Sequence, residues 1–283
     1  MKIALCLSGI VGSIKGQGGE GELLDPAFTY KYVKKYILDH NPEIDVFIHC
    51  WNTDLEEQIV NLYNPKLSIF EKQKVFKKAL NLKNPIKDFQ DLKSYFKLKI
   101  KEFLSKDLKK SNLKRKHNAC SRWYSNMKVL KLKKDYEIKN KFTYDHVMIT
   151  RFDVAFLKPV VFSNYNNKYF YASHWNDLPR PENNFKLNFI NNYEGKGFLD
   201  LWFFSNSKNM DLFASLYENM DKYSTSPHFS SREHVATFLS DKDIKYTMFR
   251  WQDFEMVRAY FFKDLPPHGS SFSILSAIKN FLK

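Results

Sequence analysis

Short apolar runs alternate along the chain with longer segments in which apolar residues recur every three or four positions. The runs predict buried β-strands, and the spaced pattern predicts amphipathic helices. The predicted strands are residues 2–8, 44–50, 67–70, 145–150, 168–172, 198–204 and 244–249. The first predicted helix begins at Pro26, with Asp25 as its N-cap. The other predicted helices cover residues 54–62, 118–134, 207–223 and 231–239. This alternation favours an α/β protein with a mostly parallel sheet covered by helices.

One segment differs from the rest in charge. Between Lys66 and Lys116 there are 16 lysines and one arginine against five acidic residues, so this stretch holds most of the net charge of +14. Its apolar residues still recur at helical spacing, which predicts amphipathic helices rather than a disordered tail. We therefore expect a core at 1–70 and 117–250, a Lys-rich helical insertion at 71–116, and a tail at 251–283 with an amphipathic helix.

The concentration of positive charge in one segment limits which partners and which cellular location we expect. It argues against a nucleic-acid partner, whereas an anionic membrane surface and a simple solvated face both stay open for the basic helices. The three cysteines, Cys6, Cys50 and Cys120, show no paired spacing and are predicted to be buried free thiols in a reducing compartment. The N-terminal apolar run predicts a strand rather than a signal peptide. We expect a cytoplasmic protein that is also compatible with peripheral attachment to the inner face of the cytoplasmic membrane.

In a parallel sheet, ligands bind beyond the carboxyl ends of the strands. Six of the nine glycines directly follow the first predicted strand, between Gly9 and Gly21. Backbone N–H groups in such a loop can bind phosphate, although the spacing is neither a Walker A loop nor a dinucleotide-binding motif. The segment is either a loop that closes on a nucleotide or diphosphate, with Lys15 as a cation, or a surface loop.

Two further strand ends hold candidate chemistry. The sequence His49-Cys50-Trp51-Asn52 ends the second strand, where Trp51 and Asn52 are placed to contact a nucleotide base or ribose, or else belong to the core. The sequence Arg151-Phe152-Asp153 follows the strand at 145–150. The carboxylate of Asp153 is placed to hold a divalent cation on a diphosphate, or it pairs with Arg151.

Three acid–base candidates lie later in the chain. Asp200 interrupts an apolar run and is a candidate catalytic base or anchor for an acceptor hydroxyl, with a carboxylate at the solvent end of the strand as the alternative. Glu233 fits a capping box with Ser230 as well as it fits catalysis. His268 lies in a late loop and is a candidate partner of Asp153 in a metal site.

The order of these pieces resembles a family of bacterial capsule and surface-polysaccharide glycosyltransferases with a GT-A-like, Rossmann-like fold. The stretches that carry the resemblance are Leu7-Ser8-Gly9, residues 45–51, residues 123–128, residues 144–153, residues 200–204 and Arg232-Glu233. The resemblance implies an enzyme that moves a sugar from a nucleotide-sugar donor of the nucleoside diphosphate type to a hydroxyl group. The implied acceptor is a capsule or surface polysaccharide, an oligosaccharide or a lipid-linked glycan.

GT-A enzymes generally hold Mn²⁺ or Mg²⁺ with an Asp-x-Asp motif, of which Asp153 matches the second position and Arg151 occupies the first. With the candidates named above, the predicted metal ligands are Asp153 and His268, and the predicted catalytic residues are Asp200 and Glu233. The predicted donor-binding residues are Ser8, Gly9, Lys15, Trp51, Asn52, Ser125, Lys128, Arg151 and Asp153. Two other classes stay open: a phospho- or sulfotransferase acting on surface glycans, and a non-enzymatic protein that binds lipid or nucleic acid through its basic helices.

Overall fold

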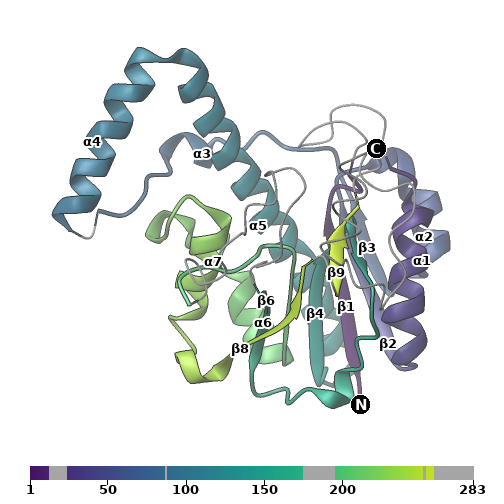
Figure 1. Cartoon of the computed structure of the whole chain (residues 1–283). Helices are drawn as coiled ribbons and strands as arrows, with labels where there is room; N and C mark the ends of the chain where they lie inside the picture. The colour runs from purple at the N-terminus through teal and green to yellow at the C-terminus, as the bar shows by residue number, and fades with distance from the viewer. Residues whose placement is uncertain (13–23, 87, 175–194, 251–252, 258–283) are drawn as a thin grey trace, which may run out of the picture.

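The computed structural model describes residues 1–12, 24–86, 88–174, 195–250 and 253–257. Within them, seven strands form one mixed sheet in the order β3-β2-β1-β4-β7-β6-β8 (Figure 1). Its strands are β1 (Ile3–Gly9), β2 (Ile44–Cys50), β3 (Leu67–Phe70), β4 (His146–Arg151), β6 (Phe170–His174), β7 (Trp202–Ser205) and β8 (Ile244–Phe249). Only β7 runs antiparallel to its neighbours in this sheet. The α/β class and the mostly parallel sheet are confirmed.

Strand β1 explains why the apolar runs are continuous. Ile3, Leu5 and Leu7 belong to one buried cluster, whereas Ala4 and Cys6 belong to another on the opposite face. A strand buried on both faces needs no polar alternation. The first face is covered by α1 (Pro26–Tyr36) and α2 (Glu56–Tyr63), and the second by α5 (Lys106–Asn140), α6 (Ser207–Ala214) and α7 (Pro227–Val235). The three cysteines are free and buried, as predicted.

Local signals place several boundaries where the sequence predicts them. Helix α1 begins at Pro26, and the Asp25 side chain caps it by accepting a hydrogen bond from the Ala27 N–H at 2.9 Å. Strands β2, β3 and β8 have the predicted bounds. Two further strands, β5 (Val154–Phe156) and β9 (Phe254–Met256), form a separate antiparallel pair that the sequence did not predict.

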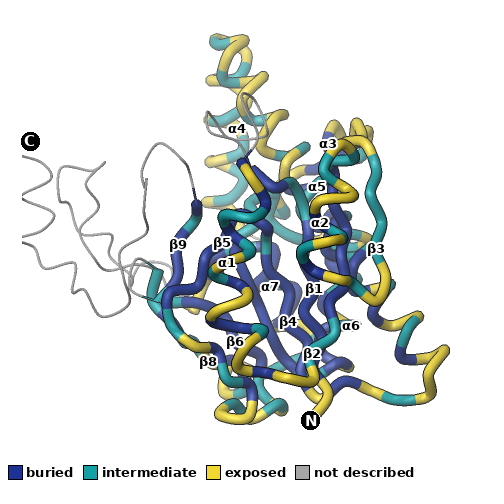
Figure 2. Tube along the Cα trace, turned by 90° about the vertical axis from the view of Figure 1, so that its right-hand side faces the viewer, coloured by how far each residue is buried: buried dark blue, intermediate teal, exposed yellow. Residues whose placement is uncertain are grey.

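Helix α5 is longer than the predicted helix at 118–134 because no glycine or proline interrupts residues 106–140. Its first buried residue is Ala119, so the preceding 13 residues extend about 20 Å beyond the sheet. Helix α4 (Phe89–Leu104) packs beside this extension, after the short α3 (Lys78–Asn81). We call residues 88–116 the arm. The predicted helices of the basic segment are confirmed in α4 and in the start of α5, whereas residues 71–76 form no helix. Figure 2 shows how exposed the arm is.

Other boundaries differ from the predictions. Only the end of the apolar run at 198–204 is a strand, because the Phe198 N–H bonds to the His228 carbonyl instead of to a neighbouring strand. Helix α6 ends at Ala214, nine residues before the predicted end. Helix α7 begins at Pro227 because proline suits the first helical position. Ser230 is therefore inside the helix, and the predicted capping box with Glu233 is wrong. The predicted tail helix lies outside the described residues.

Candidate functional site

Polar side chains meet at one edge of the sheet. The carboxyl ends of β1, β2 and β4 lie there, and because β7 is antiparallel, its beginning lies there too. Ser8 pairs with Arg151 in the strand register, and Thr150 pairs with Trp202, so Asp200 precedes β7 at this same edge. The topology thus brings together the predicted candidates Ser8, Arg151, Asp153 and Asp200.

Arg122 of α5 links these strands. Its Nη1 donates to Ser8 Oγ at 2.9 Å, and its Nη2 donates to the Asp200 carbonyl at 3.0 Å. Its buried Nε has no hydrogen-bond partner among the described residues. Burial lowers the pKa of Arg122 to about 10 and the nearby positive charge of Arg151 adds to this effect, whereas the charges of Asp200 and Asp153 oppose it only in part. The site therefore contains a guanidinium group whose charge is incompletely compensated, which favours an incoming anion.

Arg151 and Asp153 form a bidentate pair. Arg151 Nε donates to Asp153 Oδ1 at 2.7 Å, and Nη2 donates to Oδ2 at 2.5 Å. Asp153 raises the pKa of Arg151 despite burial, which acts to lower it. The start of the glycine-rich segment lies on this pair: a Cβ on Gly12, which has φ +104°, would come within 3.3 Å of the Asp153 Cβ. Of the two arrangements open for these residues, the structure has the mutually paired one.

Asp200 lies beside His228 of α7, with 3.4 Å between Asp200 Oδ1 and His228 Nδ1. The same Nδ1 is 2.8 Å from the Phe198 carbonyl. Because a carbonyl oxygen only accepts, Nδ1 must hold a hydrogen, and the basic nitrogen of the neutral ring is Nε2. Burial acts to raise the pKa of Asp200, but the charges of His228, Arg151 and Arg122 outweigh it and lower that pKa. The carboxylate is therefore ionised at neutral pH.

A second polar group lies at the end of β2. His49 Nδ1 is 2.7 Å from Ser125 Oγ, and its Nε2 is 3.0 Å from Glu71 Oε1. Burial lowers the pKa of His49, and Glu71 opposes this effect only in part. Trp51 is buried and stacks on Tyr124 with ring centroids 5.6 Å apart. The structure thus places His49 and Trp51 in the core, with Ser125 as a hydrogen-bond partner of the histidine.

The other predicted donor-binding residues take up several positions. Asn52 Oδ1 accepts a hydrogen bond from the Val11 N–H at 2.9 Å, which fixes the start of the glycine-rich segment. Gly9 ends β1 with φ +105°. Lys128 Nζ lies 5.8 Å from the centre of the Tyr124 ring, close to the His49 group. Ser8 is fully buried, and its Oγ donates to Asn126 Oδ1, so it positions Arg122 rather than facing outward.

The remaining predictions concern a base and a metal. Glu233 Oε2 accepts a hydrogen bond from the Ser224 N–H at 2.8 Å, which holds this carboxylate toward the turn before α7. Lys15 and His268 lie outside the described residues. Both Asp153 oxygens are bound by Arg151, and the described ranges contain no group of three or more His, Cys, Asp or Glu residues that could hold a metal ion. The described part of the chain does not fit a Mn²⁺ or Mg²⁺ site at Asp153.

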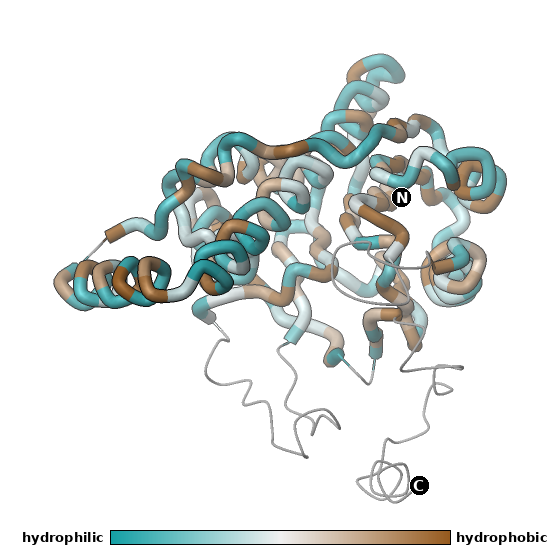
Figure 3. Tube along the Cα trace, turned by 90° about the horizontal axis from the view of Figure 1, so that it is seen from above, coloured by the Kyte–Doolittle hydropathy of each residue, from teal (hydrophilic) through white to brown (hydrophobic). Residues whose placement is uncertain are grey.

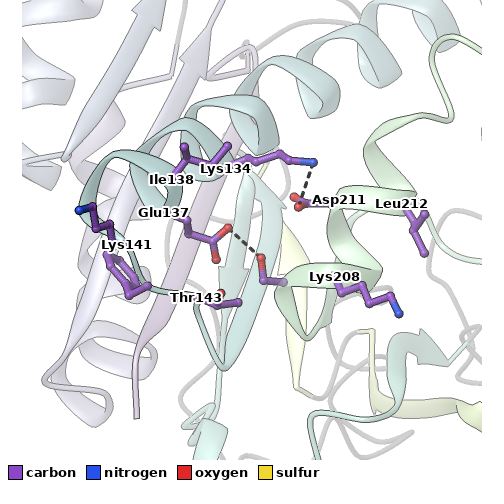
Figure 4. Close-up of a pocket in the computed structure, with 10 residues that line it drawn as sticks. Lys134, Glu137, Ile138, Lys141, Thr143, Lys208, Asp211 and Leu212 are labelled. Atoms are coloured by element: carbon purple, nitrogen blue, oxygen red, sulfur yellow. Dashed lines mark hydrogen bonds and ion pairs between the residues drawn. The ribbon is translucent and has the colours of Figure 1, made fainter.

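A pocket of about 640 Å³ lies at the opposite edge of the sheet, between the end of α5 and the start of α6 (Figure 4). Beneath it, the fully buried Lys133 Nζ is 3.0 Å from Glu137, 2.6 Å from Ser207 and 2.7 Å from Asp211. These groups satisfy one another. Since both carboxylates of this pocket, Glu137 and Asp211, are paired with Lys133, the edge with Arg122 and Asp200 is the better candidate site.

Two residues of this edge, Arg122 and His228, were not predicted from the sequence. Arg122 precedes Ser125 and Asn126 by one helical turn, so its position on the buried face of a predicted helix was a usable signal. His228 gave no such signal, because its contact with Asp200 depends on where α7 starts. Comparison with known proteins adds nothing to this geometry: no protein-family model matches the sequence, and no curated protein is significantly similar to it.

Proposed function

We propose that this protein is a glycosyltransferase, which moves a sugar from a nucleotide-sugar donor to a hydroxyl group of a surface polysaccharide or lipid-linked glycan. The observation that supports this most strongly is the meeting of Arg122 and Arg151 with the Asp200–His228 pair at the carboxyl edge of the sheet. This edge is where open α/β sheets bind their ligands. A mostly parallel sheet covered by helices is also what the resemblance to GT-A-like enzymes requires.

The two guanidinium groups suit the donor diphosphate. When the bond between the anomeric carbon and the diphosphate oxygen breaks, the electron pair and the negative charge leave with the nucleoside diphosphate. Arginine binds phosphate oxygens through planar, charge-assisted hydrogen bonds. Because the pKa of Arg122 is lowered to about 10 by burial, an anion beside it would relieve an existing electrostatic cost. Both groups are held in place before the donor arrives, by Ser8 and by Asp153.

His228 is the group we assign to the acceptor proton. Its side chain is 37% exposed, against 17% for Asp200, so an acceptor hydroxyl reaches the imidazole more easily. In this step the hydroxyl proton passes to Nε2 as the oxygen bonds to the anomeric carbon. Asp200, ionised because its pKa is lowered, stabilises the imidazolium that results. The prediction that Asp200 is itself the base is thereby replaced, in this proposal, by a role as partner of His228.

Donor binding tests the proposal without knowledge of the acceptor. Thermal unfolding of the full chain would be followed with UDP, GDP, CDP and CMP, each with and without Mn²⁺ or Mg²⁺. A ligand that binds only the native state stabilises it by about 2.7 kcal/mol at one hundred times its Kd. We expect stabilisation by one nucleoside diphosphate, and its loss in Arg151→Gln.

The control is Lys139→Gln, which removes an exposed positive charge at the far end of α5. It should keep the stabilisation. If no nucleotide stabilises the folded wild-type chain, the transferase proposal fails. A retained shift in Arg151→Gln would remove Arg151 from the donor site. Release of free nucleoside diphosphate from a nucleotide sugar, but not from other activated phosphate donors, would separate the proposal from a phospho- or sulfotransferase.

A further inference from the structure

The arm exposes large apolar side chains that no described part of the protein covers. None of the residues of α4 is buried. Five of its apolar side chains are exposed, from 57% for Phe96 to 89% for Phe103, the others being Phe89, Ile100 and Leu104. In Figure 3 these hydrophobic positions recur along α4, at the left of the view, between hydrophilic ones. A stable, water-facing helix has no need of such residues, so the pattern calls for a partner.

These five side chains form one stripe. At about 100° of rotation per residue, they fall within an arc of about 100° on the helix. The face toward α5 is a different one, since Leu92, Tyr95 and Leu98 are partly buried. A hydrogen bond of 2.9 Å from Asn112 Nδ2 of α5 to Glu102 Oε1 fixes that packing. The stripe therefore points away from the helix that holds α4 in place.

Basic side chains flank the stripe. By the same rotation, Lys97 lies along one side of it with Lys101 beyond, Lys99 lies along the other side, and Lys93 falls within the arc itself. The whole arm has nine lysines and one arginine against four acidic residues. Lysine extends its ammonium group to the surface while its methylene chain lies along apolar groups. An apolar stripe bordered by lysines is the pattern of helices that lie in the interface of an anionic bilayer.

We propose that the outward face of α4 docks on anionic phospholipid membranes, with Phe89, Phe96, Ile100, Phe103 and Leu104 among the acyl chains and the lysines at the headgroups. Charge complementarity selects this occupant. Pairing with a second copy would bring the lysines around the two stripes close to each other, and binding to a nucleic-acid backbone would leave the apolar side chains in water. None of the described helices is both long and apolar enough to cross a membrane.

The arm also sets how the molecule would sit on the surface. Arg122 lies at the carboxyl edge of the sheet, and residues 106–118 continue α5 outward from there (Figure 1). Docking through α4 would therefore place the membrane near the end of the molecule that contains the carboxyl edge, with Arg151 and Asp200. The inference about the membrane stands independently of the proposed sugar transfer, because it rests on the arm alone.

Vesicle sedimentation of the full chain tests this inference. Wild-type protein would be mixed with vesicles of pure phosphatidylcholine and with vesicles containing about one-third phosphatidylglycerol. We expect binding to the anionic vesicles, weaker binding to the neutral ones, and loss at about 0.5 M NaCl. The variant with Phe96→Ser, Ile100→Ser and Phe103→Ser should bind more than about tenfold more weakly. These side chains are exposed, so we expect its thermal unfolding to be unchanged.

Matched controls separate the stripe from general hydrophobicity and charge. Val75→Ser with Ile138→Ser removes exposed apolar side chains outside α4 and should leave binding intact. Replacing Lys93, Lys97 and Lys101 by Gln should weaken binding, whereas the same change at Lys139, Lys208 and Lys242 should have a smaller effect. Full binding by the triple serine variant overturns the proposal. So does a wild-type chain that ignores anionic vesicles, or that instead dimerises through the stripe in light-scattering measurements.

Discussion

Helix α5 contains a fully buried cation, Lys133, and a partly buried one, Arg122, whose charges are compensated in different ways. Lys133 is fully buried and has two carboxylates within 3.0 Å, those of Glu137 and Asp211. The hydrogen bonds of Arg122 all go to uncharged oxygens, namely Ser8 Oγ and the carbonyls of Asp200 and Leu201. We predict that replacing each cation by methionine has opposite consequences. In this prediction Lys133 stabilises the fold, whereas Arg122 binds the ligand.

The magnitude for Arg122 follows from its pKa. A fall from 12.5 to about 10 means that keeping this guanidinium charged costs about 3 kcal/mol more in the folded chain than in the unfolded one. Arg122→Met removes that cost and also loses hydrogen bonds to neutral acceptors, each worth about 1 kcal/mol. We therefore expect the free energy of unfolding without ligand to stay the same or to rise by up to about 2 kcal/mol. Stabilisation by a nucleoside diphosphate should be lost.

Lys133→Met is the matched comparison. It leaves the carboxylates of Glu137 and Asp211 near each other without their shared cation, the situation in which breaking a buried ion pair costs about 3–5 kcal/mol. Urea unfolding of both variants and of the wild-type chain measures the two effects on one scale. If Arg122→Met loses as much stability as Lys133→Met, then Arg122 is a structural residue. If Arg122→Met still responds to the nucleotide, its role in binding is refuted.

Three other changes test further parts of the site and core. His228→Gln should reduce the transfer rate about 10²–10⁴-fold with donor stabilisation unchanged, and a normal rate at neutral pH would rule out His228 as the base. Gly12→Ala should lower the free energy of unfolding by about 1 kcal/mol or more, because φ is +104° and the new Cβ would meet Leu24 at 3.0 Å. Gly195→Ala is the control: its φ is also positive but no atom lies near the new Cβ, so the difference between the two variants measures the effect of the Leu24 contact. Acidification should destabilise the fold, because burial lowers the pKa of His49, His146 and His234. Below about pH 6.5 the folded chain therefore binds fewer protons at these histidines than the unfolded chain does, and equal urea midpoints at about pH 7.5 and 5.5 would contradict this account.

The sheet could be predicted because its strands are buried on both faces. In β1 every position from Ile3 to Leu7 is buried, so the run is apolar without interruption. The predicted strand at 198–204 failed over residues 198–201, where the apolar residues indicate that the segment is buried but not which backbone groups it bonds to. Phe198, Leu199 and Leu201 are as buried as strand residues, yet their segment bonds to α7 rather than to the sheet. No local pattern distinguishes these two ways of burying the same side chains.

The part of the candidate site that lies on the strands could be predicted from the sequence, and the part that lies on helices could not. Ser8 and Arg151 lie at the carboxyl ends of strands and Asp153 follows one, so the rule that ligands bind at carboxyl ends brings them together without any three-dimensional information. Arg122 and His228 come from helices that cross this edge, and their side chains meet the strands only through tertiary packing. The pairing of Asp153 with Arg151 rather than with a metal is likewise a matter of side-chain geometry.

Helix α5 relates the two proposals to each other in space. It is continuous from Lys106 to Asn140, with the arm at its start, Arg122 at the sheet edge, and Lys133 and Glu137 anchored against α6 near its end. A helix fixed by that buried network cannot rotate independently of the sheet. If α4 binds the membrane, the distance and angle between the lipid surface and Arg122 are therefore set by about 20 Å of helix rather than by a flexible linker. Such geometry suits an acceptor that is itself held at the membrane, so among the acceptors considered it favours a lipid-linked glycan.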